Sequence, residues 1–351
     1  QQWNASLQHQ IGEWLIDATY AANKGNHFAA AGYNLSQVKP EVRQQLGQSL
    51  FDPLPNPYAG KIPGGLGAST VTRERTLMLF PHYNGVSVDN PRLGNYLSHQ
   101  LQLNVRRQFS SGLLLLFTYT AGKKTSDSQQ IPVNFGGPQG QFEIEGALEI
   151  GFQDGLYNRA VNKSIDPADV SQRTVISALY ELPFGRGKPW SPANVVLQKL
   201  VSGWQVNTIG VMQTGIPLVV RGANNNAANR PDSTGQSARL DHPTRQRWFN
   251  TDVFVNPPPF VLGNVGRVLP DVRTPGTVNL DLSLLKDTRL GERYTLQFRA
   301  EAFNFLNHVN LGAPNTSFGA GPAGKNVNAN FATINAARDA RVAQFALKLI
   351  F

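Results

Sequence analysis

Apolar and polar side chains alternate over residues 341–351, and the alternation continues to the last residue of the chain. Successive side chains of a β-strand point to opposite sides of a sheet, so a period of two predicts a strand with two different faces. Between the apolar positions stand Gln344 and Lys348, which tolerate water. The apolar positions are Phe345, Leu347, Leu349 and Phe351. Such a strand belongs either to a soluble β domain or to a transmembrane β-barrel.

The same alternation recurs along the chain, mostly in segments of about ten residues, the length that a tilted strand needs to cross the hydrocarbon layer. The predicted strands are 3–10, 14–22, 97–108, 113–121, 173–181, 204–220, 278–286, 293–303 and 341–351. Segments 113–121 and 173–181 fit less well. A last strand that ends on an aromatic residue is common in barrels of the bacterial outer membrane. The sequence therefore predicts an all-β, antiparallel transmembrane β-barrel, with Leu296, Phe298 and Leu347 outward and Gln297, Arg299 and Lys348 inward.

The predicted connections alternate between short and long. The short ones are 11–13, 109–112 and 287–292, with 182–203 a longer exception, and the long ones are 23–96, 122–172, 221–277 and 304–340. Loops beyond about 15 residues are uncommon in compact soluble domains. Short periplasmic turns and long extracellular loops are typical of outer-membrane barrels. With Phe351 on the periplasmic side, the long loops would lie outside the cell.

The strand count predicts an incomplete barrel. Bacterial barrels usually have an even number of strands with both ends in the periplasm, whereas the alternation gives nine, and the chain starts at Gln1 without the features of a signal peptide. We expect the chain to be the C-terminal part of a longer protein. An overlooked strand near 71–80 would change that count.

Composition excludes several classes of site. Cysteine is absent, so no disulfide or thiolate metal site can form. The longest apolar run, 113–117, is too short for a membrane helix. The formal charge of +9 is scattered singly or in pairs, which does not favour nucleic-acid binding and suits the anionic lipid and lipopolysaccharide of an outer-membrane surface.

No catalytic, cofactor or metal site is predicted, and an enzyme is not expected. No two of the six histidines stand at metal-ligand spacing, and residues 185–188 lack the spacing of a phosphate-binding loop. Residues 224–226 and Asp232 are interpreted as solvated loop rather than as a calcium or sugar site.

Two groups of strand residues are singled out by position. Asp281, Arg299 and Glu301 fall on the polar faces of neighbouring strands, where they would form a lumenal ion-pair network or remain solvated wall residues. Aromatic residues near strand ends would form a girdle at the headgroup level, or core in a soluble sandwich. These are Trp3, Trp14, Tyr20, Trp204 and Tyr294.

Several segments resemble, in order, the Oar-like TonB-dependent outer-membrane receptors of Acidobacteria and related soil bacteria. The closest are 296–308 (LQFRAEAFNFLNH) and 345–351 (FALKLIF), and the others are 2–8 (QWNASLQ), 93–102 (LGNYLSHQLQ), 180–188 (YELPFGRGK), 203–206 (GWQV), 248–250 (WFN), 262–267 (LGNVGR) and 290–293 (LGER). Their order and number, rather than any single segment, make the resemblance specific.

The resemblance implies a full protein with an N-terminal carboxypeptidase-regulatory-like domain, then a plug, then a barrel like those of 22-stranded transporters. Plug, N-terminal domain and the TonB-contacting segment would be absent from this chain. In such a family, the last strand with Phe345, Leu347, Leu349 and Phe351 is the signal that the barrel-assembly machinery reads.

Three functional classes remain open. The first is a fragment of an outer-membrane TonB-dependent receptor that transports an unidentified solute. The second is a surface adhesion or assembly protein of the outer membrane. The third is a soluble secreted β-protein, in which the apolar faces would pack on each other.

Overall fold

Nine long strands form one antiparallel sheet in the computed structural model, which describes residues 1–30, 32–89, 91–110, 112–128, 155–185, 187–222, 230–291 and 293–351. The two-residue β9 (Ser164–Ile165) lengthens the sheet beside β8. The long strands pair in chain order: β1 (Gln2–Ile11), β2 (Trp14–Phe28), β7 (Gly94–Ser110), β8 (Leu113–Ser126), β10 (Gln172–Glu181), β11 (Trp204–Gln213), β14 (Thr277–Arg289), β15 (Thr295–Phe303) and β16 (Val342–Ile350).

Each predicted strand is present, and several differ in extent; β7 begins at Gly94 and β14 continues to Arg289. β2 and β8 continue several residues into the predicted connections, to Phe28 and Ser126. The strand predicted over 204–220 ends at Gln213. Residues 71–80 do not supply a further membrane strand, because they contain the end of the three-residue β5 and the short helix α2.

The connections contain only short elements. The helices are α1 (Pro40–Leu46), α2 (Arg73–Leu77) and α3 (Val195–Val201), with 3-10 turns at Gly47–Phe51, Gly64–Gly67, Arg159–Asn162 and Pro322–Gly324. The short strands are β3 (Tyr33–Asn34), β4 (Pro53–Pro55), β5 (Thr70–Thr72), β6 (Ser87–Val88), β12 (Asp232–Ser233) and β13 (Phe254–Val255). None of the helices in the described part of the chain is long and apolar enough to cross a bilayer.

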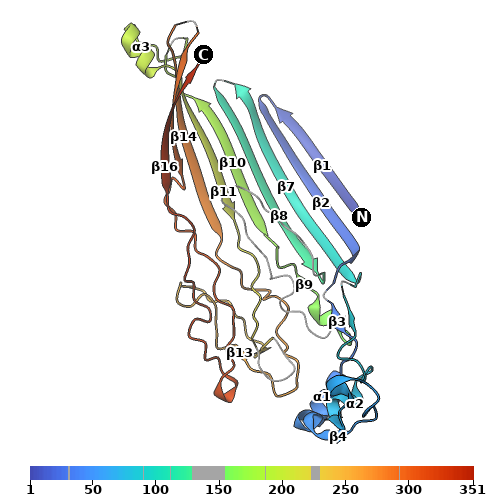
Figure 1. The fold of residues 1–351 in the computed structure, drawn as a ribbon. Helices are drawn as coiled ribbons and strands as arrows, with labels where there is room; N and C mark the ends of the chain where they lie inside the picture. Colours follow the sequence, from blue (N-terminus) through green and yellow to red (C-terminus); the bar gives the residue numbers. More distant parts are fainter. Residues whose placement is uncertain are drawn as a thin grey trace.

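The sheet is a curved wall whose two ends differ (Figure 1). The long connections leave it at one end, lower in the figure, which we call the loop end. The short turns, α3 and the C-terminus lie at the opposite end, which we call the turn end. Within the described residues, β1 pairs only with β2 and β16 only with β15, so the wall has two free edges.

The strand register gives the whole wall two distinct faces. Phe298 lies opposite Leu347, and Gln297 opposite Lys348, and the same separation continues from strand to strand. The apolar face carries, strand by strand, Leu7, Ile16, Leu103, Phe117, Ile176, Val206, Leu282, Phe298 and Leu347. The polar face carries Gln8, Asp17, Asn104, Thr118, Ser177, Asn207, Ser283, Glu301 and Gln344.

No second sheet covers the apolar face among the described residues. Leu7 is 76% exposed, Phe345 75% and Leu347 67%. An apolar surface of this size needs a nonaqueous partner. Among the described residues, the apolar faces therefore do not pack on each other as the alternative of a soluble β-protein requires.

The hydrophobic core lies outside the sheet, in the loop layer, which we define as residues 214–276 and 304–340. Its buried side chains come from both connections: Leu218, Val220, Ala238, Phe249, Val253, Phe254, Val265, Leu269, Val272, Phe318, Phe331 and Ala332. Phe331 packs edge-on against three other aromatic rings, those of Phe249, Phe254 and Phe318. The two connections thus fold together around one aromatic cluster.

This core explains why β11 ends before residue 220. A side chain at Gly215 would place its Cβ 1.8 Å from the carbonyl oxygen of Thr274, so the two segments approach closely only because residue 215 is glycine. Beyond it, Leu218 and Val220 keep their alternation but are buried in the loop layer. Extended chain that packs into a core has the same period as a membrane strand.

Candidate functional site

The predicted lumenal residues lie on the polar face of β14 and β15 and share a pocket of about 270 Å³. A guanidinium nitrogen of Arg299 lies 3.7 Å from a carboxylate oxygen of Glu301. Gln344 donates to the other oxygen of Glu301 at 2.5 Å. Asp281 accepts instead from the Asn279 side chain and the Asn304 backbone, each at 2.9 Å. The structure therefore groups the three residues, with Arg299 paired to Glu301 rather than to Asp281.

The four predicted girdle residues that lie within strands point to the apolar face. Trp3 and Tyr20 stand nearer the loop end, where the Tyr20 hydroxyl lies 2.6 Å from Nδ1 of His99. Trp14 begins β2 at the turn end, under the guanidinium of Arg107 at 5.6 Å from the ring centroid. Six residues separate Trp14 from Tyr20, about 20 Å along a strand, which suits an apolar band about 25 Å tall.

The fourth, Trp204, is held at the turn end by α3. The ammonium group of Lys286 lies 5.3 Å from the Trp204 ring centroid and donates to the carbonyls of Lys199 and Ser202 at 2.9 and 3.0 Å. The indole nitrogen of Trp204 donates to the carbonyl of Leu200. A long side chain that reaches past an apolar surface to polar groups in this way is snorkelling. The fifth girdle residue, Tyr294, directly precedes β15 at the same end.

The exposed apolar surface of α3 was not predicted. Asn194 caps the helix, since its side chain accepts from the backbone of Val196 and Leu197. Val195, Val196 and Leu200 remain exposed. Because α3 contacts Trp204 and Lys286, it stands beside the apolar face, where a helix of this kind fits a membrane interface. The cap motif at Asn194 is the signal in the sequence that would have found it.

The predicted assembly residues lie on a free edge of the wall. Phe345, Leu347 and Leu349 occupy the apolar face of β16, and Phe351 follows the strand, 93% exposed. The other long edge of β16 offers unpaired backbone groups, the geometry that β-augmentation uses. Recognition by the barrel-assembly machinery stays a prediction.

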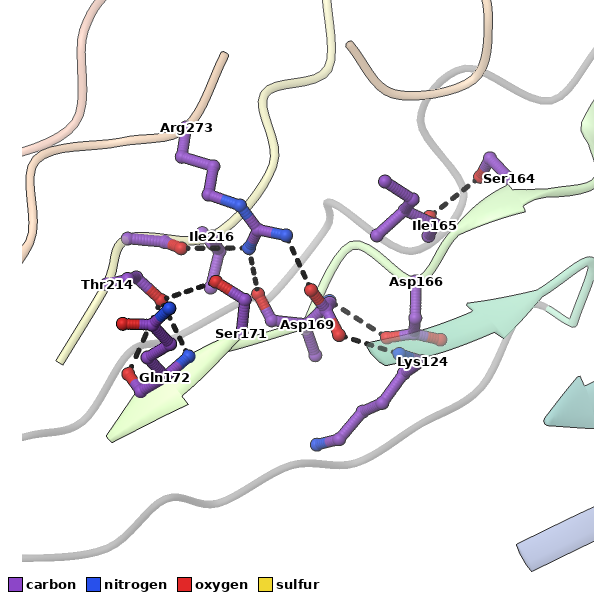
Figure 2. Close-up of polar contacts among 12 residues, drawn as sticks. Lys124, Ser164, Ile165, Asp166, Asp169, Ser171, Gln172, Thr214, Ile216 and Arg273 are labelled. Carbon is purple, nitrogen blue, oxygen red and sulfur yellow. Dashed lines mark hydrogen bonds and ion pairs between the residues drawn. The ribbon is translucent and has the colours of Figure 1, made fainter. Parts of the chain in front are cut away.

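An ion pair with a fully buried carboxylate joins the loop layer to the wall (Figure 2). Arg273 donates to a carboxylate oxygen of Asp169 at 2.6 Å, to the Asp169 carbonyl at 2.7 Å and to the Gly215 carbonyl at 3.1 Å. The other carboxylate oxygen of Asp169 accepts from the backbone of Lys124 in β8 at 2.7 Å. Asp169 is fully buried, so this junction fixes the loop layer against the ends of β8 and β10.

Two other arginines, Arg230 and Arg267, are buried among the connections, whereas Arg273 is only partly buried. Arg230 donates to the Asn162 side chain at 2.7 Å, and Arg267 to the Ser128 carbonyl at 3.1 Å. Burial lowers the pKa of Arg230 to about 10, with a smaller effect of the nearby Arg267 charge. Burial also lowers the pKa of Arg267 to about 10, and Asp166 and Asp127 oppose that shift. Both side chains stay charged at neutral pH.

Another pocket, of about 610 Å³, opens on the apolar side of the wall at the loop end. On the side of the sheet, Thr174, Met212 and Val278 of the apolar face line it, and on the side of the loop layer, Arg239 and Trp248 line it. This pocket therefore lies on the opposite side of the wall from the predicted lumenal residues Arg299 and Glu301.

In the described residues, no three potential metal ligands of the His, Cys, Asp or Glu type come together. Asp232 accepts from the backbone of Asn264 at 2.8 Å. Residues 224–226 lie outside the described part of the chain.

A protein-family model described as "Outer membrane beta barrel domain" matches residues 1–344. The chain belongs to this outer-membrane β-barrel family. The apolar face of this barrel domain is thus the membrane-facing surface, and the protein is located in the outer membrane. An all-β antiparallel architecture and this location both agree with the alternation in the sequence.

Two solved structures resemble the barrel domain at low identity. The outer membrane transporter YddB from Escherichia coli matches with 8% identity and a TM-score of 0.42, over 99% of this chain and 32% of that one. The ferric preacinetobactin receptor BauA from Acinetobacter baumannii matches with 9% identity and a TM-score of 0.35, over 99% and 28%. The chain therefore spans about a third of the length of these structures. No curated protein sequence matches it.

Proposed function

We propose that the chain forms part of the barrel wall of an outer-membrane transporter, a TonB-dependent receptor of the Oar-like kind. The observation that carries this proposal is that each of the nine long strands carries polar side chains on the face opposite the membrane-facing one. Polar side chains facing a barrel interior are what a solute path or a plug requires.

The orientation follows from the two ends of the wall. The loop end faces the outside of the cell, and the turn end, with α3 and Phe351, faces the periplasm. A loop layer with its own aromatic core supplies a shaped surface above the lumen, suited to capture a solute. A plug domain in the complete protein would contact the polar face near Arg299 and Glu301, and TonB would contact a segment outside this chain.

Uptake by living cells tests the proposal. Cells carrying the complete gene, cells lacking it, and cells carrying it in a TonB-deficient background are compared for uptake of labelled ferric siderophores, cobalamin and oligosaccharides. We expect uptake of at least one solute to require both the gene and TonB. Uptake that is unchanged in all three strains would contradict the proposal.

The same strains separate transport from the second candidate, surface adhesion or assembly. The folded loop layer is the observation that favours this alternative, because a rigid exposed surface suits a binding partner. Adhesion would depend on the gene but not on TonB. Loss of cell attachment in the gene deletion, with normal attachment in the TonB-deficient strain, would assign the loops to adhesion.

A further inference from the structure

A small pocket on the polar face lies near the loop end, between β7, β8, β10 and β11. Its volume is about 180 Å³, and its polar-face side chains include Gln100, Gln102, Thr120, Lys124, Arg173 and Gln213. Liquid water occupies about 30 Å³ per molecule, so the pocket holds one small polyatomic group with its water rather than a whole large solute.

The pocket is built by a single row of paired residues. Arg173 lies opposite Thr120 on one side and Gln213 on the other, and Thr120 lies opposite Gln102. Directly paired residues have their side chains on the same face of the sheet. One guanidinium is therefore flanked by an amide, a hydroxyl and a second amide, all of which can donate hydrogen bonds.

Gly122 also lines the pocket. It is the polar-face position of β8 between Thr120 and Lys124, and it lies opposite Gln100. A Cβ at this position would approach Cβ of Gln100 to 2.9 Å and the His99 carbonyl oxygen to 2.7 Å. Gly122 therefore allows β7 and β8 to approach closely, and it adds no side chain to this lining position.

The charges that line the pocket have one sign. Its cationic polar-face side chains are Lys124 and Arg173, and no Asp or Glu among the described residues lines it. Asp169, near Lys124, is already bound to Arg273. Asp17 and Asp281 on the same face are three and two strands from Arg173, or about 14 and 10 Å from strand spacing alone. Water and salt screen charges at such distances.

Arg173 also has an unused donor. Its Nε is buried and has no hydrogen-bond partner among the described residues. A guanidinium presents its donors in a planar fork that matches the two oxygens of a carboxylate or phosphate. The side chain thus lacks the acceptor for which its shape is suited.

We propose that this pocket binds an anionic group, a phosphate or a carboxylate, of the transported solute, with Arg173 as the principal contact and Gln102 and Gln213 as supporting donors. The inference rests on the proposed transport function and adds the chemical class of the solute. An anionic solute drawn to the loop end would meet this pocket first on the polar face of β7 to β11.

The test uses the complete protein, purified in detergent at an ionic strength of about 0.1 M, where charges at such distances are screened, and titrated calorimetrically with inorganic phosphate, with acetate and with chloride as a monatomic control. Arg173→Gln removes the charge but keeps an amide. Arg106→Gln is the matched control, since Arg106 lies on the same face of β7 nearer the turn end. Heat-modifiable migration checks that each variant is a folded barrel.

We expect saturable binding of phosphate or acetate by the unaltered protein. Arg173→Gln should weaken it roughly tenfold or more, as expected for a charge-assisted hydrogen bond, and Arg106→Gln less than about twofold. Whichever of phosphate or acetate binds more tightly identifies the group. Arg173→Lys should restore binding only in part, because an ammonium group lacks the fork.

Three results would overturn the inference. The first is the absence of saturable binding by the unaltered protein, as when a carboxylate of the plug already fills the pocket. The second is an equal weakening of anion binding by Arg106→Gln, which would indicate a general electrostatic attraction rather than a specific contact with Arg173. The third is binding of chloride as tight as that of phosphate and acetate. Failure of the transport proposal appears separately, as TonB-independent uptake with anion binding intact.

Discussion

Replacement of Phe331 by alanine tests whether the loop layer folds around one core. Phe331 is 4% exposed, and its ring centroid lies 5.0 Å from that of Phe249, 5.7 Å from Phe254 and 5.9 Å from Phe318, each in an edge-on arrangement. Phe249 and Phe254 belong to the connection after β11, and Phe318 and Phe331 to the connection after β15. The ring is thus shared by both connections.

The expected loss of stability is large. Truncation of a buried Phe to Ala costs about 3 to 5 kcal/mol, part of which comes from edge-on pairs worth about 0.5 to 1.5 kcal/mol each. Since about 1.4 kcal/mol changes an equilibrium constant tenfold, the equilibrium constant for opening of the loop layer should rise at least roughly 100-fold. Phe331→Leu, which keeps most of the volume, should cost less.

Hydrogen exchange of the folded protein in detergent measures this opening. The Trp248 amide donates to Ala332 at 2.9 Å and the Phe318 amide to Arg221 at 2.7 Å, so both report on the core. Their protection should fall in Phe331→Ala, whereas amides of β10 and β11 keep theirs. Phe305→Ala, in the same connection but 41% exposed, is the control. The reasoning would be refuted if both core amides kept their protection, or if strand amides lost theirs equally.

Three further changes test the wall, the junction and the assembly strand. Leu347→Arg should make the free energy of folding into lipid vesicles about 2 to 4 kcal/mol less favourable, because it places a charge on the membrane face. Gln344→Arg, on the polar face, should fold almost normally. Equal effects of the two changes would mean that the faces are assigned wrongly. Arg273→Gln should destabilise the loop layer by about 3 to 5 kcal/mol in denaturant unfolding, because it leaves Asp169 buried without its cation. The control Arg247→Gln, which breaks the exposed pair with Asp252, should cost less than about 1 kcal/mol. A loss for Arg273→Gln no larger than that of the control would show that the junction is not structural. Deletion of Phe351 from the complete protein should lower the amount of protein in the outer membrane without lowering its export to the periplasm. If Phe351 contributed only apolar burial, Phe351→Leu would insert almost normally. Normal surface levels of the deletion variant would exclude an assembly signal.

The alternation in the sequence was sufficient to predict the nine long strands and the face on which most of their side chains lie. A period of two is a local property, so the pattern is visible in each strand separately. Contact with lipid makes the pattern stricter, since a shift of one residue would move Arg299 or Glu301 into the membrane. For the same reason the sequence indicated that Arg299 and Glu301 share one face and that Phe345, Leu347 and Leu349 share the other, whereas their lumenal and assembly roles stay predictions.

The loop layer was not predictable in this way. Leu218 and Val220 have the period of a strand, yet they pack against Phe249 and Phe331, which follow much later in the chain. Whether such a segment enters the membrane or a core depends on a close approach at Gly215 that no local pattern records. The end of β11 was therefore placed wrongly.

Contacts between distant segments needed the tertiary structure altogether. Asp169 and Arg273 are 104 residues apart, and nothing near either of them in the sequence indicates that they pair. The row Gln102, Thr120, Arg173 and Gln213 is likewise set by the register of four strands. Which strands form, and which of their faces meets lipid, could thus be read from the sequence, because both depend on each segment and its solvent. Which polar groups meet at the loop end follows from the folded structure, because register and loop packing bring together residues that have no local relation.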